Sequence, residues 1–302
     1  MLPDIFMDPV FRIGIGFVLG AVGGSFLNVC ITRIPLGRSV ISPPSSCPNC
    51  QRPISWSRNI PILTWLSTSG DATCCKYKIP LRYFIIELSA ALLFAFLFYR
   101  CSSVDEWGLL LCSIFFTSTI LAVIAIDFET MMIPDRFSMG GALVGLSFSF
   151  FFPVLHGFSL EPVLAERTAA LFTGVTGLLI SSSLLYWVGA LGERLMNKEA
   201  LGQGDVKLLG LVGVFCGWEG GLFVIFGGAL LGTALLLPIM LWGSLSKKKT
   251  DQDGNEFGWG VEVPFGPFLG AASLLYFLGF RKAVDTWFEE IITNFIHFFS
   301  IV

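Results

Sequence analysis

Two acidic motifs stand at the ends of long apolar stretches in this sequence. Asp127 follows the apolar run 107–126, and Asp205 closes the segment Gly202-Gln203-Gly204-Asp205 in front of another apolar run. A carboxylate beside a membrane span is costly to desolvate, so by default it indicates a functional site. Two such acids at the ends of two different spans suggest a pair that meets in the fold.

A pair of neighbouring carboxyl groups has a definite chemistry. Two carboxylates that share one site cannot both ionise easily, so they hold one proton between them and can activate a water molecule. Their apparent pKa values belong to the pair rather than to either residue. We therefore predict that Asp127 and Asp205 form the catalytic pair of an aspartic-type hydrolysis at a membrane surface.

Each acid also has a simpler interpretation. Asp205 could cap the helix that follows it, because Asp is a favoured N-cap residue. Glu129 and Asp135 are rival partners, although Asp135 follows a proline and could cap the next span, and Glu129 could face water. The glycines before Asp205 favour the catalytic interpretation, since they would let the backbone approach a peptide substrate closely.

Four of the eight cysteines lie in one polar segment. Cys47 and Cys50 form a Cys-x-x-Cys knuckle of the kind that supplies two thiolates to a tetrahedral metal, and Cys74 and Cys75 form an adjacent pair. We predict that the four bind zinc in a structural site, because four thiolates leave no open position for a substrate. The alternative is a set of reduced thiols or a redox pair.

The composition is that of an integral membrane protein. Of the 302 residues, 54% are hydrophobic and 14% are charged, whereas a soluble domain has about 25% charged residues. We predict an all-α polytopic membrane protein with about eight transmembrane helices. The apolar runs that predict these helices are 11–31, 83–100, 107–126, 137–155, 168–190, 206–217, 220–243 and 264–280.

The distribution of charge orients these spans. The polar segment 32–82 holds many basic residues against the single acid Asp71, so the positive-inside rule places it in the cytoplasm and the N-terminus outside. Alternation of the spans then places Asp127 and Asp205 at the cytoplasmic face. The tail 281–302 has apolar residues at helical spacing, which predicts an amphipathic helix lying in the membrane interface.

These features divide the chain into four parts. They are a first transmembrane span (1–31), a cytoplasmic cysteine-bearing loop domain (32–82), a catalytic transmembrane bundle (83–280) and an amphipathic C-terminal helix (281–302). Glu87, near the start of a span, is an unusual acid that could be functional or could reach back to the polar interface.

The sequence resembles the type IV prepilin peptidase family, which consists of GxGD-type intramembrane aspartyl proteases. The resemblance runs along most of the chain in a consistent order. The matching motifs are Gly24-Ser25-Phe26-Leu27-Asn28-Val29 with Arg33-Ile34-Pro35, the cysteine segment with 59–66 and 79–83, the segment 126–135, and Gly202-Gln203-Gly204-Asp205-Val206-Lys207.

The resemblance implies that Asp127 and Asp205 are the catalytic pair. It implies a bacterial cytoplasmic (inner) membrane enzyme that acts on prepilins or type II secretion pseudopilins. The implied substrate has a short basic leader ending in Gly, followed by an apolar helix, and is cut after that Gly on the cytoplasmic side. Many members also methylate the new N-terminus with S-adenosylmethionine, an activity linked to the cysteine-bearing loop. The expected partners are therefore prepilin or pseudopilin substrates and membrane lipid, with no nucleic acid.

The second cysteine pair departs from the family's pattern, in which another Cys-x-x-Cys comes just before the Ile-Pro segment. Here Ala72 stands where the earlier cysteine belongs, Cys75 holds the later position, and Cys74 is displaced. The altered spacing bears on metal binding and methylation and leaves the proteolytic motifs untouched.

Two other functions are compatible with the spans. The first is an ion- or proton-coupled transporter in which Asp127 and Asp205 bind cations or relay protons, and the second is a catalytically silent assembly scaffold. Transporters tend to place such acids near the bilayer midplane and often show repeated halves. Here the acids stand at span ends and no repeat is evident, which favours the enzyme.

Overall fold

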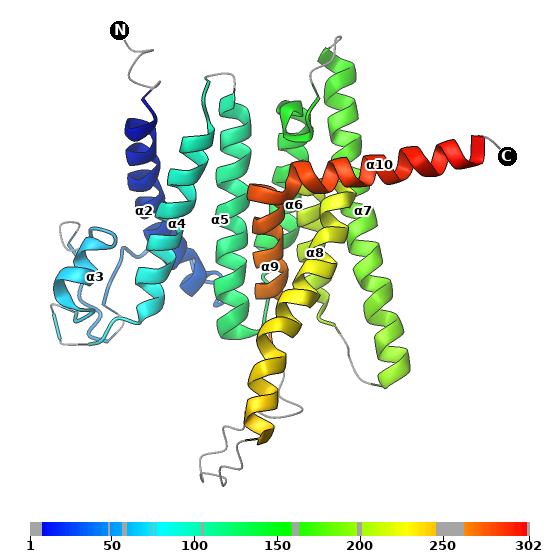
Figure 1. Ribbon diagram of the computed structural model, residues 1–302. Coiled ribbons are helices and arrows are strands. Elements are labelled where there is room, and N and C mark those ends of the chain that lie inside the picture. The colour runs from blue at the N-terminus through cyan, green and yellow to red at the C-terminus, as the bar shows by residue number, and fades with distance from the viewer. Residues whose placement is uncertain are drawn as a thin grey trace. The chain divides into compact units, whose positions relative to one another are not determined.

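The computed structural model is built from helices, and its chain divides into two compact units, Met1–Ile126 and Asp127–Val302 (Figure 1). Its described residues contain no β-strands, only two isolated bridges, which agrees with the all-α prediction. The residues that the structure describes are 8–47, 49–55, 59–72, 74–75, 77–103, 106–158, 163–197, 201–245 and 263–300.

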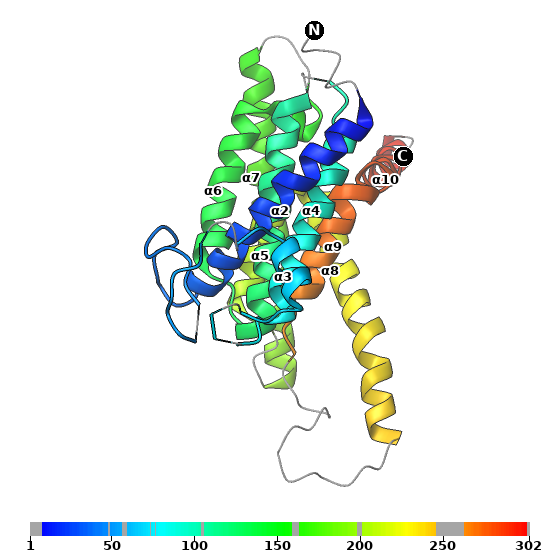
Figure 2. The same cartoon turned by 90° about the vertical axis from the view of Figure 1, so that its left-hand side faces the viewer.

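The N-terminal unit is organised around two crossing helices, α2 and α4 (Figure 2). Its described helices are α2 (Pro9–Arg33), α3 (Leu63–Thr68), α4 (Leu81–Arg100) and most of α5 (Trp107–Thr130). Helix α2 begins where the Asp8 side chain accepts a hydrogen bond from the backbone N–H of Val10 at 2.9 Å. A Cβ atom on Gly20 would collide with the carbonyl oxygen of Ala90, so the missing side chain lets α2 and α4 touch through their backbones.

A buried carboxylate holds the segment between α2 and α4. Glu87, which is 9% exposed, accepts a hydrogen bond from the backbone N–H of Ile62 at 2.7 Å. The side-chain amide of Asn28 in α2 donates a hydrogen bond to the carbonyl oxygen of Tyr83 at 3.0 Å, which also joins α2 to α4. Ile62 has a φ of 64°, which is rare for a β-branched residue. Glu87 therefore faces protein groups and fixes a strained residue directly before α3.

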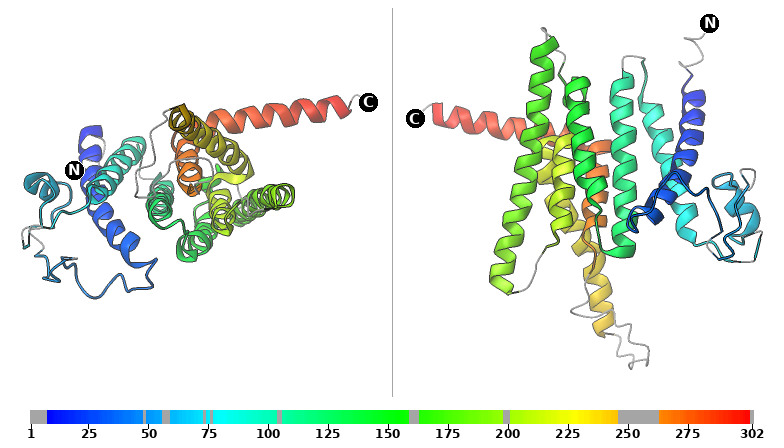
Figure 3. Two further views of the ribbon diagram at one scale, coloured as in Figure 1. Left: turned by 90° about the horizontal axis from the view of Figure 1, so that it is seen from below. Right: turned by 180° about the vertical axis from the view of Figure 1, so that it is seen from behind.

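The C-terminal unit is organised around α8, against which α6, α7 and α9 all pack (Figure 3). Its described elements are α6 (Asp135–Phe151), the short turn η3 (Pro153–His156), α7 (Val163–Met196), α8 (Gln203–Leu245), α9 (Gly266–Leu275), the turn η4 (Tyr276–Phe280) and α10 (Arg281–Ser300). A Cβ atom on Gly177 of α7 would collide with the carbonyl oxygen of Gly213 in α8, and a Cβ atom on Gly213 would collide with the carbonyl oxygen of Gly177. These two helices therefore meet backbone to backbone.

Helix α8 is interrupted at Gly217, whose φ of 72° and ψ of −179° are not helical. Glycine adopts a positive φ without steric cost. The hydroxyl of Tyr276 donates a hydrogen bond to the carbonyl oxygen of Cys216 at 3.1 Å, which gives a polar group beside the break a buried partner. The break lies at the last residue of the predicted span 206–217, directly before the predicted span 220–243.

Among the described residues, α2, α4, α5, α7 and α8 are long and apolar enough to cross a membrane. The chain is therefore an integral membrane protein. The predicted span 137–155 coincides largely with the 17-residue α6, and the span 264–280 coincides with α9 and η4. These segments are too short to be assigned by length alone, so the count of eight spans stays a prediction.

The predicted C-terminal helix is present as α10, which extends away from α9 in Figure 3. Trp218 of α8 contacts Phe288 of α10 with ring centroids 5.3 Å apart, which anchors one end of the helix. Farther along, Phe295 and Ile296 are 64% and 61% exposed. An interfacial position of α10 would cover these apolar side chains and stays a prediction.

The contact between α7 and α8 gives a stability prediction. Gly213→Ala should push the two helices apart and lower the free energy of unfolding by about 1–3 kcal/mol, the usual cost of overpacking. Gly210→Ala is the matched control on the same helix, because its Cβ would lie 3.7 Å from Leu178 and Ser182, an ordinary contact. Thermal unfolding of the purified protein in detergent measures both, and equal melting temperatures would contradict the assigned contact.

Candidate active site and cysteine cluster

Asp127 lies in the last turn of α5 and is 5% exposed. The helix ends at Thr130, and Met131 has a φ of 51°, so the chain turns directly after it. Helix α6 then begins at Asp135, with Pro134 as its N-cap residue. The first acidic motif is therefore a tight connection between two helices, with its first carboxylate buried.

Asp205 lies in the first turn of α8 and is 8% exposed. It is the third residue of a helix that begins at Gln203, so it does not occupy the N-cap position that the simpler interpretation gave it. A Cβ atom on Gly204 would lie 3.1 Å from Cβ of Ile133, closer than an ordinary contact. Glycine at this position therefore lets the start of α8 pack on the first acidic motif.

The start of α9 completes the surroundings of Asp127. A Cβ atom on Gly266 would lie 2.5 Å from Oδ2 of Asp127 and 3.2 Å from Cδ1 of Ile133. Ile133 thus lies beside both Gly204 and Gly266. Asp127 is also close enough for its charge to act on the carboxylate of Asp205. The structure therefore brings the two predicted acids into one buried volume beside Ile133.

One oxygen of this pair has no protein partner. Oδ2 of Asp127 is buried and forms no hydrogen bond with any described residue. Buried polar atoms normally have a partner, so an unsatisfied oxygen marks a position for a water molecule, a shared proton or a substrate group. Two carboxyl groups in this arrangement can hold one proton between them and activate a water molecule.

The two rival acids are placed differently. The carboxylate of Asp135 forms an ion pair with Nζ of Lys207 at 2.7 Å, with the two side chains 60% and 37% exposed. This ion pair joins the first acidic motif to α8, but it lies at the surface and not beside the buried carboxyl groups of Asp127 and Asp205. Glu129 is exposed. The geometry therefore favours Asp205 as the neighbour of Asp127.

Gly266 is the residue of this site that the sequence analysis did not identify. Its closeness to Asp127 depends on how α9 packs within the C-terminal unit, and motif spacing does not report that packing. A local signal was present, because Gly266 stands between Pro264-Phe265 and Pro267 at the start of an apolar run. Two prolines around one glycine indicate a constrained backbone rather than the middle of a span.

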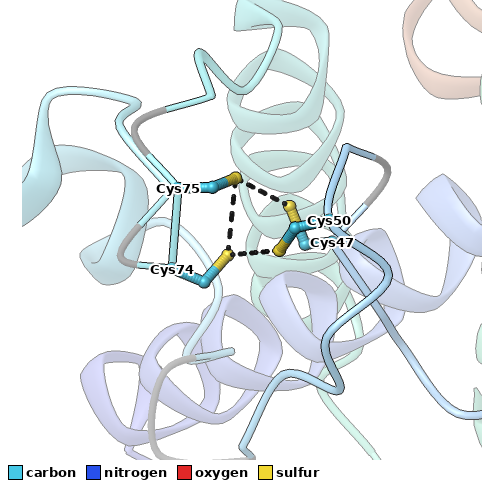
Figure 4. A group of neighbouring side chains, drawn as sticks. All are labelled: Cys47, Cys50, Cys74 and Cys75. Atoms are coloured by element: carbon cyan, nitrogen blue, oxygen red, sulfur yellow. Dashed lines mark hydrogen bonds between the residues drawn. The ribbon is translucent and has the colours of Figure 1, made fainter.

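The four predicted metal ligands converge in the N-terminal unit (Figure 4). The sulfur atoms of all four cysteines lie within 4.8 Å of one another. Cys47 and Cys75 are 3.5 Å apart, Cys50 and Cys74 are 3.4 Å apart, and Cys74 and Cys75 are 3.8 Å apart. These cysteines are free thiols rather than disulfides.

This arrangement fits a tetrahedral metal ion. Four sulfurs placed about 2.3 Å from zinc are separated by about 3.8 Å, close to the observed spacings. Hydrogen bonds from the backbone N–H groups of Cys50 and Asn49 lower the pKa of Cys47, which favours the thiolate that metals bind, whereas hydrogen bonds with Cys50 and Cys47 raise the pKa of Cys74. The adjacent spacing of Cys74 and Cys75 therefore does not prevent four-cysteine convergence, and the cluster could bind a metal.

The fold and these sites define a polytopic membrane protein with paired carboxyl groups at helix ends and a four-cysteine cluster. Residues 18–101 match the Bacterial Peptidase A24 N-terminal domain, and residues 114–237 match the Type IV leader peptidase family. No solved structure matches the chain.

Curated relatives agree with these matches. A prepilin leader peptidase/N-methyltransferase of Pectobacterium carotovorum subsp. carotovorum is 30% identical over 283 residues, covering 86% of this chain and 91% of the relative. The protein of the same name from Klebsiella pneumoniae is 35% identical over 209 residues, covering 67% and 84%. That from Myxococcus xanthus (strain DK1622) is 29% identical over 260 residues, covering 84% and 72%. The chain belongs to the type IV leader peptidase family.

The cysteine cluster gives a prediction about metal content. Elemental analysis of the purified protein should find about one zinc ion per chain, because the four sulfurs suit one tetrahedral ion. Replacing Cys47 and Cys50 by Ser should remove the zinc, whereas Cys101→Ser, which lies outside the cluster, should retain it. Wild-type protein purified without a chelator and containing no metal would favour the reduced-thiol interpretation.

Proposed function

We propose that this protein is a membrane aspartyl endopeptidase that removes the leader from type IV prepilins or pseudopilins, with Asp127 and Asp205 as its catalytic pair. The observation that carries the assignment of the residues is the convergence of two buried carboxyl groups from two different helices. The activity follows from membership of the type IV leader peptidase family. The cited relatives are named as peptidases, so the transporter alternative has no support from them.

The chemistry requires one carboxyl group of the pair to be ionised and the other protonated. The ionised group takes a proton from a water molecule, whose oxygen then attacks the carbonyl carbon of the scissile peptide bond. The protonated group gives its proton to the carbonyl oxygen. When the tetrahedral intermediate collapses, the C–N bond breaks and the leaving amine takes a proton from the pair. Gly202 and Gly266 keep side chains away from the pair, because a Cβ atom there would lie 3.4 Å from Oδ2 of Asp205 and 2.5 Å from Oδ2 of Asp127.

The proposed orientation follows from charge. With the basic segment 32–82 in the cytoplasm, the N-terminus lies outside and eight spans alternate so that both acidic motifs face the cytoplasm. A substrate leader rich in Lys and Arg would then meet an acidic site on its own side of the membrane. We retain the four-part division into first span, cytoplasmic cysteine-bearing domain, catalytic bundle and C-terminal helix, with the whole protein in the bacterial inner membrane.

The second proposed activity is N-methylation of the new N-terminus, which is part of the name of the relatives. S-adenosylmethionine would supply the methyl group, and the amine freed by cleavage would accept it. No residue is assigned to bind this cofactor. Cys47, Cys50, Cys74 and Cys75 would hold a structural zinc ion that fixes the two turns of the cysteine-bearing segment against each other.

Substitution of the pair tests the catalytic assignment. Asp127→Asn and Asp205→Asn should each lower cleavage of a model prepilin in membranes by at least about 100-fold, because an amide can neither accept nor donate the required proton. Asp135→Asn is the matched control: it removes the exposed ion pair with Lys207 and should retain most activity. Near-normal cleavage by either Asp127→Asn or Asp205→Asn, with the protein still in the membrane, would refute the assignment.

Mass spectrometry of the product separates the two activities. The model prepilin should be cut after the leader Gly in every reaction, and only with S-adenosylmethionine should the mature product gain the mass of one methylene group. Both results together would show that the adjacent Cys74-Cys75 pair is compatible with methylation. Cleavage without the gain in mass would leave a peptidase alone and identify the cysteine-bearing segment as the altered part.

A further inference from the structure

A groove runs between the second half of α8 and the start of α9 in the C-terminal unit, two helices that lie side by side in Figure 3. Its volume is about 450 Å³, within the range of about 300–1,000 Å³ that is usual for ligand sites. Gly232, Leu236 and Leu237 of α8 line one side, and Val263, Phe265 and Phe268 line the other.

The lining offers a ligand almost no polar group. Thr233 is the polar side chain of the groove, and its hydroxyl already donates a hydrogen bond to the carbonyl oxygen of Ala229 at 2.8 Å. A Cβ atom on Gly232 would lie 3.5 Å from the ring of Phe268, so the absence of a side chain there widens the groove. An occupant must therefore be apolar, since a polar group would lose its hydrogen bonds to water without replacement.

One lining residue of the groove is the chain neighbour of a residue that contacts Asp127. Phe265 lines the groove, and the next residue is Gly266, where a Cβ atom would lie 2.5 Å from Oδ2 of Asp127. Phe265, which lines the groove, is therefore the chain neighbour of Gly266, the residue that lies against Oδ2 of Asp127. A chain whose scissile bond is held at the carboxyl pair would place its neighbouring residues at the mouth of the groove.

We infer that this groove receives the first turns of the apolar helix that follows the cleavage site of the substrate. The inference rests on the proposed function and adds a second point of recognition to it. An amphipathic or apolar helix that lays one face in an apolar groove is a common mode of peptide recognition. The groove recognises the segment after the scissile bond, and the leader before the bond is recognised by charge. A lipid acyl chain has similar chemistry, but contact with lipid gives no reason for the groove to adjoin the residue that contacts Asp127.

The first test compares two substrates with one enzyme. Gly232→Leu should fill the groove and lower, by about tenfold, the ratio of kcat/KM for a full prepilin to kcat/KM for a short leader peptide without the apolar helix. Leu230→Phe is the matched control, because Leu230 is 69% exposed on the same helix outside the groove and its substitution should leave the ratio unchanged. If Gly232→Leu does not fold, Thr233→Phe fills the same space from an exposed position.

A ratio that is unchanged in the filled variants, or lowered equally by the control, would overturn the inference. Wild-type protein that cleaves neither substrate would instead overturn the proposed function, so the two failures are distinguishable.

A second measurement, by cross-linking, identifies the molecule that occupies the groove. A photoreactive residue in place of Leu237, which lines the groove, should cross-link to the prepilin helix in membranes, and one in place of Leu235, outside it, should not. Adducts of lipid alone at Leu237 in the presence of prepilin would also overturn the inference.

Discussion

The backbone contact between Gly177 and Gly213 determines where α8 can lie, and most of the C-terminal unit depends on α8. Within a membrane, helices gain little from the hydrophobic effect and associate through close packing of small residues. Helix α8 carries Asp205 in its first turn, breaks at Gly217 and lines the apolar groove in its second half. A change in how α7 and α8 pack would therefore displace both the carboxyl pair and the groove.

The carboxyl pair itself is placed at a cost in free energy, because buried carboxyl groups lose hydration that few neighbours replace. The structure confines this desolvation cost to the two carboxyl groups. Glycines at 204 and 266 bring helix starts against Ile133 and Asp127 without adding side chains. The Asp135–Lys207 ion pair joins the same two motifs, but in an exposed position. Groups that stabilise the arrangement are thus separate from the groups available for chemistry.

The sequence was a good guide to helices and motifs and a poor guide to contacts. Long apolar runs have few structural alternatives, so the membrane helices and the interruption of α8 near Gly217 were predictable. The approach of Gly266 to Asp127 was not, because it depends on how α9 packs. The four cysteines were predicted to bind one zinc ion, but the adjacent spacing of Cys74 and Cys75 made this prediction less secure, since spacing along the chain does not show how two turns face each other. The eight-span count, the orientation and the catalytic assignment remain predictions.

The bond between Glu87 and Ile62 has a mechanical consequence for the N-terminal unit. A hydrogen bond to a charged group contributes about 1.5–3 kcal/mol, and a residue in a sparsely populated backbone region costs about 1–3 kcal/mol. Detaching Ile62 from Glu87 would lose the first quantity and recover only the second, and it would also expose the side chain of Ile62, which packs with Ala21 of α2 and Ala91 of α4. The bond and this packing together therefore fasten the cysteine-bearing segment to the two membrane helices.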